Sequence, residues 1–200
     1  MKTTNAPLIR SLIAASLLAI GAGAHAQNTA NDVQRDVHQQ QRIEQGLKSG
    51  ELNTREASKL EREEAGVDKM EARALKDGHM SAQEQARINA AQNHVSQDIY
   101  RDKHNATLGN PDSVSSKRMQ ADVQRNVNQE KRIESGIKSG EMTNREVSRA
   151  ERQEGKIDRR EARAGADGHV GAREQRNIQR AENRESKRIH RAKSNDAVRG

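Results

Sequence analysis

The stretch "RIEQGLKSGE" at residues 42–51 occurs a second time, as "RIESGIKSGE", at residues 132–141, with eight of ten positions identical. These stretches belong to a longer internal repeat. A shift of 90 residues aligns 32–105 with 122–195 without a gap and gives 39 identities in 74 pairs. The sequence therefore predicts one structural unit written twice in tandem.

A linker is expected between the two copies. Residues 107–116 contain Pro111 among Gly, Asn and Ser, a composition typical of flexible connections. This divides the chain into a first repeat at 27–106, a linker at 107–116 and a second repeat at 117–200.

Each copy is predicted to contain three helices, because apolar residues recur at steps of three and four. The apolar positions of the first copy are Val33, Val37, Ile43 and Leu47, then Ala57, Leu60, Val67 and Ala74, then Ile88, Ala91, Val95 and Ile99. We therefore expect an all-α fold built from two helix–turn–helix–turn–helix units.

The first 26 residues have the pattern of an export signal. Lys2 and Arg10 are positively charged, Leu12 to Ile20 form a short apolar core, and Ala24-His25-Ala26 matches a small-x-small cleavage site. The apolar run is shorter than the roughly 20 residues of a membrane span, and no later segment approaches that length. We expect a mature chain in the periplasm or secreted, with no transmembrane segment.

The mature chain has few residues for an apolar core. From Gln27 onward there are 23 Leu, Ile and Val in 174 residues, with no Phe or Trp and a single Tyr. Helix-forming Ala, Glu, Arg, Lys and Gln dominate. This composition favours long, solvated helices with thin apolar stripes that a second copy could complete, so a homodimer is one expectation. Enzymes rarely use such scaffolds.

The turns between the helices have a common design. Glycines that end a helix in the left-handed conformation are expected at Gly50, Gly78, Gly140 and Gly168. Capping boxes that begin the next helix are expected at Asn53 with Glu56, Ser81 with Glu84, and Thr143 with Glu146.

The stretch "KDGHMSAQE" (76–84) also matches the second half of a twelve-residue calcium loop. Arg73 and Leu75 stand at loop positions 1 and 3, where carboxylates belong, so the helix-cap interpretation is favoured and no cofactor is predicted. Weak calcium binding is retained as an alternative, with Asp77, Glu84, Asp167 and Glu174 as the candidate ligands.

These turns resemble the helix-loop-helix of the EF-hand superfamily in a degenerate form. The whole repeat, from "QQQRIEQGLKSGEL" through "DGHMSAQEQARI" to "SQDIYRDKHN", is similar to small exported bacterial helical-repeat proteins that have no established activity. The EF-hand resemblance implies paired turns, with Leu52 near Met80 and Met142 near Val170.

No catalytic motif is present in the sequence. The chain has no cysteine, no G-x-S-x-G nucleophile motif and no phosphate-binding glycine loop. His79 and His169 lack a further metal ligand at helical spacing. We therefore predict a protein that is not an enzyme.

The charge differs between the two halves. Residues 27–116 have 12 Lys and Arg against 15 Asp and Glu, whereas residues 117–200 have 22 against 14. This asymmetry predicts an anionic envelope component or another protein chain as partner. The candidate contact residues are Arg159, Arg160, Arg163, Arg184, Lys187, Arg188, Arg191 and Lys193. Nucleic acid is an unlikely partner, because of the expected export and because almost no aromatic side chain is available for base stacking.

The leading functional hypothesis is an exported, non-enzymatic helical protein that binds or scaffolds in the bacterial envelope. Two alternatives are retained: a weak calcium-binding EF-hand-like protein, and a periplasmic helical chaperone or stress adaptor.

Overall fold

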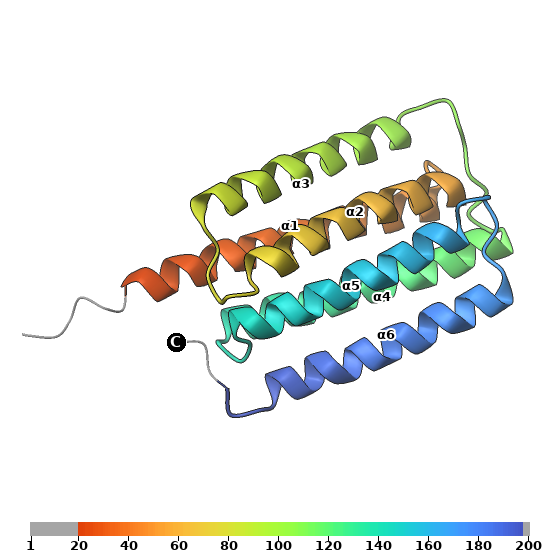
Figure 1. The fold of residues 1–200 in the computed structure, drawn as a ribbon. Coiled ribbons are helices and arrows are strands. Elements are labelled where there is room, and N and C mark those ends of the chain that lie inside the picture. The colour runs from red at the N-terminus through yellow and green to blue at the C-terminus, as the bar shows by residue number, and fades with distance from the viewer. Residues whose placement is uncertain (1–19, 198–200) are drawn as a thin grey trace, which may run out of the picture.

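The computed structural model describes residues 20–197, with side chains from residue 27 onward. This part of the chain is all α-helical and contains six helices and no strand (Figure 1). The helices are α1 (Ile20–Ser49), α2 (Thr54–Ala74), α3 (Ala82–Lys103), α4 (Val114–Lys138), α5 (Asn144–Ala164) and α6 (Ala172–Lys193). The all-α prediction is confirmed. The predicted export signal, 1–26, lies mostly outside the described residues.

Four of these helices form the centre of the molecule. α1 packs against α4 and α2 packs against α5, while α3 and α6 cover opposite sides (Figure 1). α2 and α5 are antiparallel, because Ser148 Oγ donates to the Ala72 carbonyl at 2.6 Å and Arg159 Nη1 donates to the Ala65 carbonyl at 3.3 Å. The result is a four-helix bundle with one additional helix on each flank.

The turns pair across the two halves of the chain. Leu52 and Met80 lie at opposite ends of α2, whose 21 residues span about 30 Å, so the pairing implied by the EF-hand resemblance is wrong. Leu52 instead shares an apolar cluster with Val170, and Met142 shares another with Met80.

Hydrogen bonds between the turns hold this arrangement. Arg55 Nη2 donates to the Asp167 carbonyl at 3.0 Å, and Asn144 Nδ2 donates to the Gly78 carbonyl at 2.7 Å. These bonds tie the start of α2 to the α5–α6 turn and the start of α5 to the α2–α3 turn.

The segment between α3 and α4 is held against the α1–α2 turn. Gly109 N–H donates to the Gly50 carbonyl at 2.8 Å. A Cβ at Gly109 would lie 2.4 Å from the Leu52 carbonyl oxygen, so only glycine permits this approach. α4 begins at Val114, inside the range 107–116 that the sequence assigned to the linker.

Candidate metal centre

The interior of the bundle contains carboxylates where apolar side chains are usual. On α2 and α5 they recur at steps of three and four, which places each set on one helical face. The buried members, each at most 3% exposed, are Glu61, Glu64, Asp68 and Glu71 on α2, Glu151, Glu154, Asp158 and Glu161 on α5, Asp32 and Asp36 on α1, Asp122 and Glu130 on α4, and Glu182 and Glu185 on α6. Among the described residues, no lysine or arginine is buried with them.

Two carboxylate triads are close enough to share a cation. One comprises Glu61, Asp158 and Glu161, and the other comprises Asp68, Glu130 and Glu151. In each triad, one oxygen from every side chain lies within 4.8 Å of the other two. α2 and α5 approach closely here: a Cβ on Gly155 would be 3.0 Å from the Asp68 Cβ. The absence of a side chain at Gly155 permits this approach.

Burial makes these groups hard to ionise. It raises the pKa of Asp36 and Glu61 to about 7 and that of Asp122 to about 8. Burial, strengthened by the charges of neighbouring carboxylates, also raises the pKa of Glu130 and Glu151 well above the usual range. The cluster therefore needs positive charge, from protons or from metal ions, to be stable in the folded protein.

Several of these carboxylates lack any hydrogen-bond partner. Both oxygens of Glu64, Glu151 and Glu154 are unpartnered within the described part of the chain, and each side chain is at most 1% exposed. Glu64 belongs to neither triad. Burial raises its pKa well above the usual range, and the charges of Asp36 and Asp68 raise it further. Buried acceptors without donors are costly, and a coordinated cation would satisfy them.

The donor set indicates the class of ion that would fit. All candidate ligands are carboxylates, which suit Ca²⁺, Mg²⁺ and Mn²⁺ better than the softer transition metals. The two triads contain no histidine or cysteine.

The candidate ligands of the calcium-binding alternative lie away from this centre and accept hydrogen bonds from backbone N–H groups. Asp77 and Asp167 accept from the N–H groups of His79 and His169 at 3.0 and 2.8 Å. Glu84 accepts from Ser81 N–H at 2.9 Å, and Glu174 accepts from Gly171 N–H at 2.8 Å.

The helix-turn residues have the following geometry. Gly50, Gly78, Gly140 and Gly168 have positive φ angles of 80°, 99°, 77° and 88°. Capping boxes link Asn53 with Glu56, Ser81 with Glu84, and Thr143 with Glu146.

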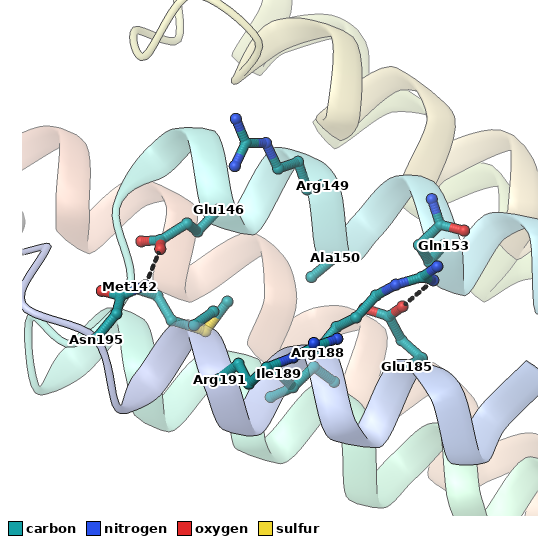
Figure 2. A pocket seen from close by; sticks show the side chains of 11 residues that line it. Met142, Glu146, Arg149, Ala150, Gln153, Glu185, Arg188, Ile189, Arg191 and Asn195 are labelled. Carbon is teal, nitrogen blue, oxygen red and sulfur yellow. Dashed lines mark hydrogen bonds and ion pairs between the residues drawn. The ribbon is translucent and has the colours of Figure 1, made fainter.

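A separate cavity of about 390 Å³ lies between α5 and α6 (Figure 2). Its lining combines apolar Met142 and Ile189 with the guanidinium groups of Arg149, Arg188 and Arg191. Arg188 also pairs with the buried carboxylate of Glu185 at 3.0 Å, as Figure 2 shows.

The basic residues expected from the sequence are only partly brought together. Arg160, Arg184 and Arg188 line one groove between α5 and α6, and Lys187 and Arg191 line another between α4 and α6. Three others lie apart from these grooves: Arg159 donates to the Ala65 carbonyl, Lys193 pairs with Glu141 at 3.2 Å, and Arg163 is exposed near the end of α5.

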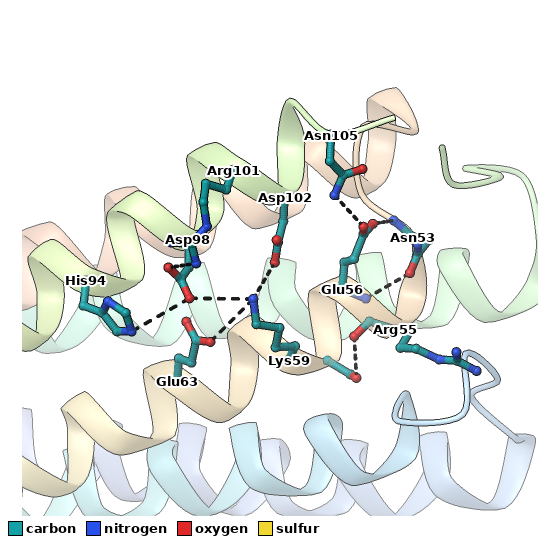
Figure 3. Close-up of polar contacts among 11 residues, drawn as sticks. Asn53, Arg55, Glu56, Lys59, Glu63, His94, Asp98, Arg101, Asp102 and Asn105 are labelled. Carbon is teal, nitrogen blue, oxygen red and sulfur yellow. Dashed lines mark hydrogen bonds and ion pairs between the residues drawn. The ribbon is translucent and has the colours of Figure 1, made fainter. Parts of the chain in front are cut away.

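The interface of α2 with α3 shows how the chain neutralises carboxylates near its surface (Figure 3). Lys59 Nζ lies 3.1 Å from Asp102, 3.6 Å from Asp98 and 3.9 Å from Glu63. Asp98 also pairs with Arg101. Lys59 and Arg101 neutralise part of this network, which fixes α3 on α2. In the bundle centre, Arg125 and Arg188 pair with Glu182 and Glu185 from α6, but among the described residues no lysine or arginine forms an ion pair with the carboxylates of the two triads.

None of the described helices is long and apolar enough to cross a membrane. Comparison of the chain with protein-family models, with curated proteins and with solved structures finds no match.

Proposed function

We propose that this protein binds hard divalent cations in the carboxylate interior of its helical bundle. The observation that carries the proposal is that both oxygens of the buried carboxylates Glu64, Glu151 and Glu154 have no hydrogen-bond donor among the described residues. Cation binding would replace the protons that otherwise neutralise these groups, so uptake of metal would release protons.

The internal repeat indicates how the cation-binding interior would be assembled, and the export pattern indicates where the protein would act. Two tandem three-helix units, α1–α3 and α4–α6, would each supply half of the cation-binding interior. Support for this arrangement comes from the 39 identities between the copies and from the packing of α1 on α4 and α2 on α5. The export pattern at 1–26 favours a periplasmic or secreted protein that handles cations without acting as an enzyme.

Thermal unfolding of the mature chain at pH 7.5 tests cation binding directly. Addition of 1 mM Ca²⁺ or Mn²⁺ to protein prepared in chelator should raise the melting temperature, because the ion binds the folded state selectively. A cation at about 100 times its Kd stabilises by about 2.7 kcal/mol. Proton release on addition of metal to a weakly buffered sample provides a second measurement.

A turn variant provides the control for this experiment. Glu84→Gln combined with Glu174→Gln removes the carboxylates of the calcium-loop resemblance but leaves the interior unchanged. Its metal-dependent shift should equal that of the wild type. If Ca²⁺, Mn²⁺ and Mg²⁺ all leave the melting temperature and the proton count unchanged, the proposed function is wrong.

The groove between α5 and α6 that is lined by arginine side chains favours anion binding as a second candidate function. Arg160, Arg184 and Arg188 come together with Lys156 at the α5–α6 surface, which would suit an anionic envelope polymer. We expect Arg160→Gln with Arg184→Gln to elute from a heparin column at clearly lower salt than the wild type.

A matched charge change in the first half of the chain controls for net charge. Arg62→Gln with Arg87→Gln removes the same charge from exposed sites outside the groove. Equal elution of the two double variants would show that net charge, and not the groove, determines retention.

A further inference from the structure

The two carboxylate triads occupy nearly repeat-equivalent places but differ in composition. On α2 and α5 the equivalent positions are identical: Glu61 corresponds to Glu151, Asp68 to Asp158, Glu64 to Glu154 and Glu71 to Glu161. On α1 and α4 they differ, because Gln40 corresponds to Glu130 and Asp36 corresponds to Asn126. Each exchange replaces a carboxylate with an amide of nearly the same shape.

Both amides lie at the same triad. Gln40 Nε2 donates to Glu61 at 3.1 Å, and Asn126 Nδ2 donates to Asp158 at 3.2 Å and to Glu161 at 2.9 Å. The triad of Glu61, Asp158 and Glu161 therefore receives N–H donors from the protein itself, and these occupy the positions at which a cation would act.

The other triad receives no N–H donor from the described chain. Four of its six carboxylate oxygens are unpartnered: Asp68 Oδ2, Glu130 Oε2 and both oxygens of Glu151. Asp68 shares a hydrogen bond with Asp158, and Arg159, the cation that acts on Asp68, donates to the Ala65 carbonyl.

The surroundings of this donor-free triad add further carboxylates. Glu154 is 1% exposed, both of its oxygens are unpartnered, and its charge acts on Glu130 and Glu151. Asp36 and Glu71 lie beside the triad and accept from Gln92 Nε2 at 2.8 and 3.2 Å. The amide of Gln92 thus bonds to these two side chains and leaves the triad oxygens available.

We infer that the protein has one principal cation centre, formed by Asp68, Glu130 and Glu151, and that its counterpart is closed by the amides of Gln40 and Asn126. This inference rests on the proposed function, because it assigns the cation to one of two otherwise similar sites. The divergence of the two repeats thereby converts a symmetric bundle into an asymmetric one, with a metal centre on one side and a hydrogen-bonded support on the other.

Calorimetric titration of the mature chain with Ca²⁺ and with Mn²⁺ tests the assignment. The wild type should bind one cation tightly. Asp36→Asn with Glu130→Gln copies the amides of the closed site and should weaken binding by roughly 100-fold or more, since loss of a merely supporting carboxylate costs 10–100-fold. Glu61→Gln, at the closed site, should leave this affinity within about threefold of the wild type.

The reverse exchange gives a gain of binding. Gln40→Glu with Asn126→Asp should open the closed site and raise the stoichiometry from one cation to two. Helical content and melting at pH 5, where protons neutralise the interior, verify that each variant folds. Equal losses in Asp36→Asn/Glu130→Gln and in Glu61→Gln would overturn the assignment to one triad. Failure of the wild type to bind either ion would refute the proposed function itself.

Discussion

The free energy of unfolding of the cation-free protein should fall by several kcal/mol as the pH rises from about 5 to about 8. Burial raises the pKa of Asp36, Glu61 and Glu182 to about 7 and that of Asp122 to about 8. In the unfolded chain these carboxyl groups titrate near 4. Between these values the folded state binds more protons than the unfolded state, so stability decreases with increasing pH.

The size of the effect follows from the pKa shifts. Each additional proton held by the folded state lowers stability by about 1.4 kcal/mol for every unit by which the pH rises. Glu61, whose pKa changes from 4.5 to about 7, alone contributes roughly 3 kcal/mol. This stabilisation is complete below the unfolded-state pKa and is lost as the pH passes through the folded-state value.

The charges around Glu61 support this direction. Gln40 from α1 and Asn126 from α4 lower its pKa by hydrogen bonding, but burial has the larger effect. The groups facing it from α5 are the carboxyls of Asp158 and Glu161, and among the described residues no cationic side chain contributes to the shift of its pKa.

Urea unfolding followed by circular dichroism at pH 5, 6, 7 and 8, in the presence of chelator, measures this dependence. Divalent cation added at pH 8 should restore the part of this stability that is lost at the donor-free triad and at Asp36 beside it, because the metal supplies positive charge there. The part contributed by Glu61, which belongs to the closed site, should stay lost. A stability that increases from pH 5 to pH 8 without metal would contradict the buried-carboxylate account.

The helices and their apolar faces could be predicted from the sequence because they follow ordinary periodicity. Ile43, Leu47, Leu60 and Val67 lie in the apolar cluster at no more than 1% exposure, at the three- and four-residue steps from which the helices were predicted. The middle helix of each copy nevertheless has too few apolar residues to account for the number of its residues that are buried. The structure resolves this discrepancy, because α2 and α5 bury a second face made of acids.

The acidic face was missed because a charged helical face normally contacts solvent. The available signal was the identity of the two copies at these positions, with Glu64 matching Glu154 and Asp68 matching Asp158. Identity alone does not mark a buried position, because the exposed Arg62 and Arg152 are identical in the two copies as well. Glu185 is a further buried acid on a predicted apolar face: it stands at the position equivalent to Val95 and is 1% exposed.

The tertiary pairing of the turns could not be derived from the turns themselves. Capping boxes and left-handed glycines specify where a helix begins and ends but contain no information about the partner of the turn. Leu52 shares a cluster with Val170 because α2 and α5 are antiparallel. That pairing involves contacts along both helices, such as the Ser148–Ala72 hydrogen bond and the close approach of Gly155 to Asp68.

Replacement of Glu64 and Glu154 together by leucine should stabilise the cation-free protein at pH 8 by about 2–4 kcal/mol. Among the described residues, neither oxygen of either carboxylate has a hydrogen-bond partner, and each side chain is 1% exposed. Burial of these polar groups is therefore not compensated by hydrogen bonds, whether they are ionised or protonated. Leucine removes two groups whose pKa values burial raises well above the usual range. The variant lacks two groups that bind protons in the folded state. The slope of the unfolding free energy against pH between pH 5 and pH 8 should therefore become shallower by up to about 2.7 kcal/mol per pH unit.

The repeat also provides the control for this variant, in Glu44 and Glu134. These two repeat-equivalent carboxylates form ion pairs near the surface with Lys48 and Lys138. Their joint replacement by leucine should change stability by less than about 1 kcal/mol and leave its pH dependence intact, because such pairs contribute little. Urea unfolding of the two double variants at pH 5 and pH 8 separates the effects. If Glu64→Leu with Glu154→Leu destabilises the chelated protein at pH 8 while the control does not, the carboxylates contribute to stability without a cation, and the interpretation of the interior as a metal-requiring cluster is wrong.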